Sequence, residues 1–511
     1  MNLTLDEIQN FKGKYPKQIW GLFFSEMWER FCFYGMRGML TFFIAHVLLE
    51  NSVLKIAEKN ETANLQYGAI QAFVYAFTFL GGMLADKILG FRKSLFWGGI
   101  LMIAGSIILS INPHDFFFFG ISFTVVGTGF FKPNISTMVG KLYKSGDSRT
   151  DAGFSLFYAG INLGALIGGY VCIAIGKGEM FSKYIPENLR WNIAFSLAAF
   201  VMVISLINFL FTQRKLGTIG LQPGHPLSEN PETKISKWKE YAVYAGTFAL
   251  IPLIQIMVHK TQYTDYFMAV IGPLTLIYFF YEMMKVSTSE RKKLLAALVF
   301  ILFSILFWGI YEQSGGSLSI FAANNLNKDL FGLDPNGVNN SGGSFFIIFL
   351  APLLGLLWIW LGKRKIEPNT VVKFGLGFLF LGMGYYVLFA TKFFANLQGV
   401  TSLNIFTIAL LVITFGELCL SPIGLSIMTK LSTKNLQGMM MGMWFLASAY
   451  GQYVAGKIGA GMAKVEDGAT NYDALITYAD GYKQLGLYAL IAGIILILIS
   501  PIIKKLMQEV R

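Results

Sequence analysis

Charged side chains interrupt several long apolar segments of this 511-residue chain. In the first segment, at about 100° per residue, an arc of roughly 140° on one helix face holds Glu26, Glu29, Arg30, Phe33, Tyr34 and Arg37. A charged side chain at the bilayer centre costs at least ~2.5–3.5 kcal/mol, so such residues usually face a cavity and mark a pathway. Alternatively, neighbouring Glu and Arg could merely neutralise one another for helix packing, but that would not require four ions and a tyrosine on one stripe.

A lysine lies beside a helix-breaking residue in a later apolar segment. Pro133 follows Lys132, removes a backbone donor and should bend the helix, which leaves the carbonyl of Gly129 without its usual partner. A buried lysine beside such a break suits a ligand site. The alternative is that Lys132 extends to the cytoplasmic interface, since Lys141 follows about two and a half turns later.

Two acidic residues stand in the second part of the chain. Glu417 lies about fourteen residues into an apolar run, which places it near the middle of a bilayer. Glu312 lies in the segment from Trp308 to Ser314, closer to the end of its run, where an interfacial cap is an alternative to a functional role.

The overall composition indicates a membrane protein. Charged residues make up only 14% of the chain and hydrophobic residues 54%, against roughly 25% charged residues in a soluble domain. The three cysteines, Cys32, Cys172 and Cys419, have no CxxC spacing, which disfavours disulfide scaffolds and zinc sites.

A membrane-spanning helix needs about 20 mostly apolar residues, and the sequence predicts an all-α integral membrane protein with fourteen of them. The windows are 19–48, 66–86, 93–112, 115–139, 152–175, 190–212, 240–258, 264–285, 294–316, 343–362, 371–392, 403–429, 437–463 and 482–503. A polar, lysine-bearing stretch precedes the first window, which itself carries charges, so it does not resemble a cleaved signal peptide.

The net charge of +12 comes from basic clusters in alternate loops. Eight loops carry them: Lys12/Lys14/Lys17, Lys87/Arg92/Lys93, Lys141/Lys144/Arg149, Arg214/Lys215, Arg291/Lys292/Lys293, Lys363/Arg364/Lys365, Lys430/Lys434 and Lys504/Lys505. The positive-inside rule therefore predicts a multi-pass protein of the cell membrane with both termini in the cytoplasm. Nucleic-acid binding would need one continuous basic face, which this scatter disfavours.

A polar, proline-bearing linker divides the predicted spans into six and eight. We expect a six-helix bundle over 1–213, a cytoplasmic linker over 214–239, two inserted transmembrane helices over 240–285 and a second six-helix bundle over 286–511. Parallel six-span halves are the plan of the major facilitator superfamily. The segment 82–93 resembles that superfamily's short loop motif, with a weaker echo at 355–365 that lacks the aspartate.

Four motifs together resemble the proton-dependent oligopeptide transporter family, also called the POT, PTR2 or peptide transporter family. The segment 26–31 resembles its ExxERF signature and the segment 157–164 its FYxxINxG signature, while 127–134 and 417–424 resemble two further segments. The motifs occur in order and cover both halves. Two extra helices between the halves are common in bacterial members, which suits the fourteen predicted spans.

The resemblance implies uptake of di- and tripeptides driven by the inward proton gradient. It implies proton coupling by Glu26, Glu29, Arg30 and Lys132, and substrate binding by Tyr34, Arg37, Tyr75, Lys132, Asn162, Trp308, Glu312, Glu417, Ser421 and Trp444. Within this set, the carboxylate of the peptide would bind to Arg37, Lys132, Tyr34 and Tyr75. The amino terminus of the peptide would bind to Glu417 and Asn162. Arg37 and Glu312 resemble a bridge between the halves.

Two positions depart from the family pattern. Phe33 stands where a second tyrosine is frequent, so the polar arc lacks one hydroxyl. Gly343 stands in a segment that often contains an asparagine, which would help to hold the amino terminus of the peptide.

The sequence therefore predicts a proton-coupled peptide symporter of a bacterial cell membrane and not an enzyme. Its expected partners are di- and tripeptides, protons and the lipid bilayer. We expect no cofactor, no metal, no nucleic acid and no obligate protein partner. A proton-coupled drug or metabolite transporter of the same superfamily is the main alternative. A membrane-embedded hydrolase is a remote one, because the chain lacks HExxH and GxSxG motifs.

Overall fold

The computed structural model describes residues 4–144, 146–228, 231–232, 235–420, 424–432, 436–464 and 468–508. Among these residues every regular element is a helix, and the only bridge between extended segments pairs Leu326 with Thr401. Twelve helices within the same residues are long and apolar enough to cross a membrane. This confirms the all-helical membrane architecture that the composition predicts.

Two further long helices fall outside these twelve. They are α5 (Phe117–Gly140) and α16 (Gln437–Met462), with 24 and 26 residues. Both carry polar residues in their interiors, Lys132 and Asn134 in α5 and Gln452 in α16, and such residues lower the mean hydropathy. The total of fourteen membrane spans therefore stays a prediction, whereas twelve of the described helices are apolar enough to cross a membrane.

The chain divides into two compact units, which are described separately. The first contains Met1–Met39 and Phe73–His259, and the second contains Leu40–Ala72 and Lys260–Arg511. Two helices, α2 (Gln18–Phe43) and α3 (Ile56–Leu84), continue from one unit into the other.

The other elements of the first unit are α1 (Leu5–Gln9), η2 (Ala85–Leu89), α4 (Phe91–Ile111), α5, α6 (Thr150–Gly176), η3 (Glu187–Leu189), α7 (Arg190–Gln213) and α8 (Lys237–His259). Helix α4 packs against both α5 and α7. A Cβ atom added to Gly98 of α4 would lie 2.5 Å from the carbonyl oxygen of Gly127 in α5. Small residues at this crossing let the two backbones touch, as is common between membrane helices.

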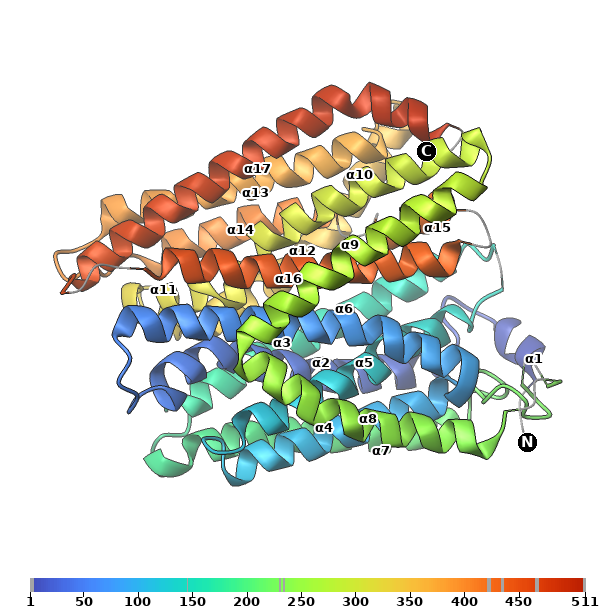
Figure 1. The fold of residues 1–511 in the computed structure, drawn as a ribbon, viewed down its shortest axis with the longest axis horizontal. Coiled ribbons are helices and arrows are strands. Elements are labelled where there is room, and N and C mark those ends of the chain that lie inside the picture. Colours follow the sequence, from blue (N-terminus) through green and yellow to red (C-terminus); the bar gives the residue numbers. More distant parts are fainter. Residues whose placement is uncertain are drawn as a thin grey trace. The chain divides into compact units, whose positions relative to one another are not determined.

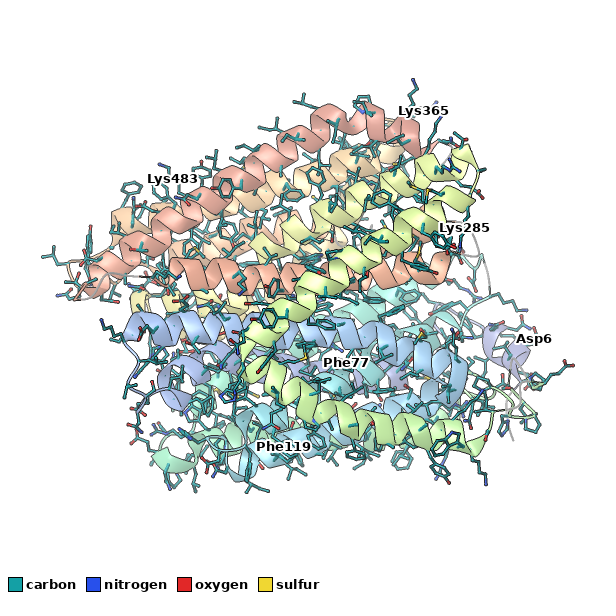
Figure 2. All side chains as sticks on the ribbon, viewed as in Figure 1. Asp6, Phe77, Phe119, Lys285, Lys365 and Lys483 are labelled. Atoms are coloured by element: carbon teal, nitrogen blue, oxygen red, sulfur yellow. The ribbon has the colours of Figure 1, made fainter. Side chains whose placement is uncertain are left out.

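Basic loops meet at one end of the first unit. Lys144 pairs with Asp6 at 2.9 Å, and the side chain of Gln18 donates a hydrogen bond to the carbonyl of Lys215. Arg92 in turn donates to the carbonyl of Gly217. The hydrogen bond from Lys144 lowers the pKa of the Asp6 carboxyl, which Figure 2 labels at this end. Residues 4–18, the described part of the loop 141–149, the start of α4 and the residues after α7 therefore lie together at this end.

The second unit begins with the end of α2, η1 (Ile44–Leu48) and the first half of α3. Its other elements are α9 (Thr261–Lys285), α10 (Thr288–Tyr311), η4 (Glu312–Gly315), α11 (Ser317–Asn325), α12 (Pro335–Lys363), α13 (Thr370–Ala390), η5 (Thr391–Phe394), α14 (Leu403–Leu420), α15 (Gly424–Leu431), α16 and α17 (Asn471–Met507). Figure 1 shows α13 and α17 side by side, and α13 also packs on α14. At that second contact, a Cβ on Gly377 would lie 2.9 Å from the carbonyl of Gly416.

Helices of the second unit connect two distinct ends. Lys285 and Lys365 both lie toward one of them (Figure 2), and Asn369 hydrogen-bonds to Ser500 near the end of α17. At the other end, the side chain of Asn325 donates to the carbonyls of Gly399 and Asn471. The continuous run α10–η4–α11 and helix α17 therefore extend between these two ends.

The consecutive helices α8 and α9 belong to different units. Helix α8 packs on the first unit, where Trp97 donates a hydrogen bond of 3.1 Å to Thr247. Helix α9 packs on α16, where Tyr453 and Lys457 both contact Asp265 at 2.8 Å.

Candidate functional site

A buried ionic triad occupies α2 in the first unit. Glu26, Glu29 and Arg30 are each at most 1% exposed. The Nε atom of Arg30 lies 3.0 Å from a carboxylate oxygen of Glu26 and 2.5 Å from one of Glu29. The helical spacing places both acids against one guanidinium, as the stripe on this face predicts. One arginine shared by two carboxylates leaves a formal charge of −1 in a buried environment.

A second cation comes from α5. Lys132 interacts electrostatically with both Glu26 and Glu29, and its Nζ atom lies 4.5 Å from the ring centroid of Tyr75 in α3. Helix α5 continues through Pro133, which leaves the lysine inside the helix. Lys132 is partly buried and lies over the Tyr75 ring, within electrostatic range of the acids of α2.

The polar face of α2 continues beyond the triad. The guanidinium of Arg37 lies 5.7 Å from the ring of Tyr34, and both side chains are partly exposed. Phe33 is buried, and its ring lies 5.3 Å from the guanidinium of Arg30. Phe33, which stands where family members often have a tyrosine, therefore packs against the guanidinium of the triad.

Helix α6 supports the triad through its backbone. A Cβ at Gly164 would lie 2.1 Å from the carbonyl oxygen of Met27 and 3.0 Å from the Cβ of Arg30. The spacing in the FYxxINxG motif therefore has a packing reason, because any side chain at this position would separate α6 from α2. Asn162, one half-turn earlier, is buried and donates a hydrogen bond of 2.9 Å to the carbonyl of Tyr158 in its own helix.

In the second unit, Glu312 lies at a break inside a long span. Helix α10 ends at Tyr311, the turn η4 follows, and α11 continues to Asn325, so the composite span runs over Thr288–Asn325. The helical run extends beyond the sequence window 294–316 at both ends. The run Gln313–Gly316 is polar and contains glycine, so the apolar stretch of the sequence ends there. The chain nevertheless continues as a helix. Glu312 is only 5% exposed, so its side chain is buried.

Tyr311 completes an acidic site on α14. Its hydroxyl donates a hydrogen bond to the carboxylate of Glu417, which is 9% exposed. The ring of Trp308 meets Tyr311 edge-on, with centroids 5.3 Å apart. Sequence reasoning missed Tyr311 as a site residue. The available signal was its spacing of three residues from Trp308, which places both on one helix face.

Two further positions singled out in the sequence lie in the same unit. A Cβ at Gly343 would lie 3.9 Å from the hydroxyl oxygens of Tyr311 and Thr414, so the position that departs from the family pattern faces the site. Trp444 is buried, and its indole lies against Gly424, where a Cβ would meet it at 2.0 Å. Ser421 lies outside the described residues.

The structure therefore brings the predicted residues together in two groups. One, in the first unit, contains the triad, Lys132 and Tyr75, with Tyr34 and Arg37 further along α2. The other, in the second unit, joins Trp308 to Glu417 through Tyr311. Across the described parts of the chain, no three His, Cys, Asp or Glu side chains are arranged to hold a metal ion.

Comparisons with known proteins show which family the chain belongs to. A model of the POT family matches residues 92–473. The chain is 31% identical over 513 residues to the peptide transporter YePEPT of Yersinia enterocolitica, with 97% of this chain and 96% of the relative covered. It is 32% identical to a di-/tripeptide transporter of Lactococcus lactis subsp. cremoris over 100% of both chains.

A solved structure extends the agreement to the fold. The crystal structure of a mutant peptide transporter POT in complex with alafosfalin superposes with a TM-score of 0.79 at 30% identity, with 99% of this chain and 100% of that chain covered. The family model spans most of the sequence, and the relatives span its whole length. The resemblance carried by the four motifs is confirmed: the chain belongs to the POT family, whose members are transporters and not enzymes.

Proposed function

We propose that this protein is a proton-coupled symporter that imports di- and tripeptides by alternating access. The observation that carries the proposal is the buried triad of Glu26, Glu29 and Arg30 beside Lys132 in a member of the POT family. Its relatives include a di-/tripeptide transporter, and related structures hold peptide-like ligands. The transported ion would be the proton, and no further cofactor is invoked.

Proton coupling follows from the cost of a buried charge. In this proposal Glu29 is an anion while Arg30 and Lys132 neutralise it, and burial without a partner favours its protonated form. If Lys132 turns from Glu29 toward a peptide carboxylate, Glu29 loses part of the positive charge that stabilises its anion. The protonated form of Glu29 is then favoured. Proton binding and peptide binding would then support each other, which is the requirement for symport.

A peptide zwitterion needs a cationic and an anionic pole. We propose that Arg37 and Lys132, with the hydroxyls of Tyr34 and Tyr75, receive the carboxylate. Glu417 would receive the ammonium, with Asn162 and Ser421 as further polar contacts and with Trp308 and Trp444 as walls for the side chains. The hydrogen bond from Tyr311 holds the Glu417 carboxylate in one orientation.

Alternating access requires two halves that move as bodies. We propose a first bundle over 1–213 and a second over 286–511, joined by a cytoplasmic linker over 214–239 and two inserted helices over 240–285. Helices α5 and α16 would also span the membrane, which makes fourteen spans with both termini in the cytoplasm of a bacterium. Arg37 and Glu312 would pair when the cavity faces inward.

Uptake by purified protein in liposomes tests this function directly. An inward proton gradient should drive accumulation of labelled dialanine, and a protonophore should abolish it. Unlabelled di- and tripeptides should compete, whereas free alanine and a tetrapeptide should not. Gradient-driven uptake of a drug or metabolite with no competition by dipeptides would overturn the peptide assignment.

A further inference from the structure

The regular hydrogen bonds of an α-helix are interrupted between α10 and α11. The N–H of Gly316 donates to the carbonyl of Gln313, three residues earlier instead of four. Gly316 itself has φ −109° and ψ −111°, which is not a helical conformation. The tighter spacing and the non-helical residue together remove the usual N–H donors of carbonyls on either side. Several backbone carbonyls inside the span Thr288–Asn325 therefore need other partners.

Four side chains supply these partners, and each donates to a different carbonyl of the interrupted segment. The pairs of donor and carbonyl are Tyr385 with Ile310 at 2.5 Å, Asn339 with Ser314 at 2.6 Å, Gln313 with Gly309 at 3.1 Å, and Thr41 with Gly315. All four donor side chains are at most 3% exposed. Apart from Gln313, they come from three other helices, α13, α12 and α2. Contacts from distant parts of the chain therefore stabilise the break.

Two glycines let α3 approach the same segment. A Cβ at Gly315 would lie 2.0 Å from the hydroxyl oxygen of Tyr67, and a Cβ at Gly316 would lie 2.8 Å from the side-chain oxygen of Asn64. A side chain at either position would displace α3. The break is thus enclosed by its neighbours as well as hydrogen-bonded to them.

The acidic site begins directly at this break. Ile310 precedes Tyr311, the last residue of α10, whose hydroxyl donates to the carboxylate of Glu417. Because Tyr385 binds the carbonyl of Ile310, it fixes the last turn of α10 and with it the direction of Tyr311. Tyr385 also interacts electrostatically with Glu312, the first residue of η4. A buried hydroxyl on α13 is therefore connected to the acidic site through the backbone of α10.

We propose that Tyr385 is a positioning residue for peptide recognition: its hydrogen bond to the end of α10 holds Tyr311 where it orients the Glu417 carboxylate toward the peptide ammonium. This inference rests on the proposed function, which supplies the peptide and the role of Glu417. It has a chemical consequence, because Tyr385 matters only for ligands that carry a free ammonium.

Removal of one hydroxyl tests the proposal. Tyr385→Phe keeps the ring and loses the donor, so the KM for dialanine uptake in liposomes should rise about threefold with a smaller change in kcat. The affinity for N-acetylated dialanine, measured by competition, should stay the same. Tyr478→Phe is the matched control, since Tyr478 is 2% exposed and its hydroxyl has no hydrogen-bond partner within the described residues. Like the ring of Tyr385, its ring packs near Tyr482, and the variant should behave as wild type.

A double-variant cycle separates positioning from a general loss of structure. In the Tyr311→Phe background, Tyr385→Phe should add almost no further change in KM, because residues that act through one contact are not additive. Thr41 gives a second test that does not depend on the folding of Tyr385→Phe. Thr41→Val lacks the hydroxyl that binds the carbonyl of Gly315, whereas Thr41→Ser keeps a hydroxyl. The valine variant should raise the KM for dialanine, and the serine variant should match wild type.

Each result decides the inference. An unchanged KM in Tyr385→Phe, equal losses for free and N-acetylated dialanine, or additive effects with Tyr311→Phe would overturn the positioning role. If Tyr385→Phe does not fold, equal KM values for Thr41→Val and Thr41→Ser would overturn it. Wild-type uptake of dialanine is measured in the same liposomes, and its absence would overturn the proposed function. Normal uptake, with an ammonium-specific loss in Glu417→Gln and none in Tyr385→Phe, would overturn the positioning role alone.

Discussion

The hydroxyl of Tyr311 donates a hydrogen bond to the carboxylate of Glu417, and this contact joins the end of α10 to the last turn of an apolar helix, α14. A carboxylate in a largely buried position is stabilised by such a donor, because hydrogen bonds to charged groups are the stronger ones. Tyr311 also fixes which way the carboxylate faces. The acidic pole of the site is therefore a pair of residues from two helices.

Removal of the Tyr311 hydroxyl should weaken peptide binding. A hydrogen bond to a charged group contributes about 1.5–3 kcal/mol, and part of that free energy holds Glu417 in its binding orientation. We expect Tyr311→Phe to raise the KM for dialanine about three- to tenfold with a smaller change in kcat. Tyr488→Phe, at an exposed position on α17, is the control. An unchanged KM in Tyr311→Phe would show that the contact does not orient the binding group.

Neutralisation of Glu29 should separate binding from energy coupling. Glu29→Gln mimics the protonated carboxyl, so the variant should no longer respond to the proton gradient. We expect loss of gradient-driven accumulation and survival of peptide counterflow, both measured in liposomes. Glu187→Gln, with a side chain 90% exposed in the first unit, should behave as wild type. Normal accumulation by Glu29→Gln would remove this residue from the mechanism.

The proposed pair of Arg37 and Glu312 can be tested by exchange of the two charges. Each single neutralisation should impair transport, since it strands the other charge in a low-dielectric environment. If Arg37 also binds the substrate carboxylate, the double variant Arg37→Glu/Glu312→Arg should stay inactive although it restores a pair. Full activity of that variant would mean that the pair alone matters.

Glu417 should recognise the amino terminus of the peptide. A charge-assisted hydrogen bond to an ammonium contributes ~1.5–3 kcal/mol, so Glu417→Gln should bind dialanine about ten- to a hundredfold more weakly. N-acetylated dialanine lacks the ammonium, so it should compete poorly with the wild type and lose little more in the variant. Competition for labelled dialanine measures both affinities. Equal losses for the two ligands would assign Glu417 a structural or proton-coupling role.

The contact of Gly164 with α2 should limit stability. A methyl group at this position would meet the Met27 carbonyl, and overpacking of this kind costs about 1–3 kcal/mol. We expect Gly164→Ala to lower the Tm of the purified protein by several degrees and to impair transport. The control is Gly246→Ala on α8, where no atom lies within 4 Å of the added Cβ. It should leave the Tm unchanged or raise it, because alanine is the better helix former.

Much of the architecture could be read from the chain itself. Apolar length predicts membrane helices, and the described helices begin and end close to most of the predicted windows, for example α7 (Arg190–Gln213) at 190–212. The stripe of Glu26, Glu29 and Arg30 was predictable because helical periodicity over a few residues decides which side chains share a face. Its ion pairs follow from neighbouring positions on one helix.

Other features depend on contacts between distant segments, which no local pattern contains. Tyr311 and Glu417 are 106 residues apart, and only the packing of α10 near α14 brings them together. The sequence did not predict that α10 continues through η4 into α11. A polar stretch in the sequence looks the same whether it breaks a helix or ends a membrane span. Sequence by itself determined the helices, their polar faces and the family, because these depend on local composition and order, whereas the tertiary structure decided which faces meet and which buried polar groups find partners.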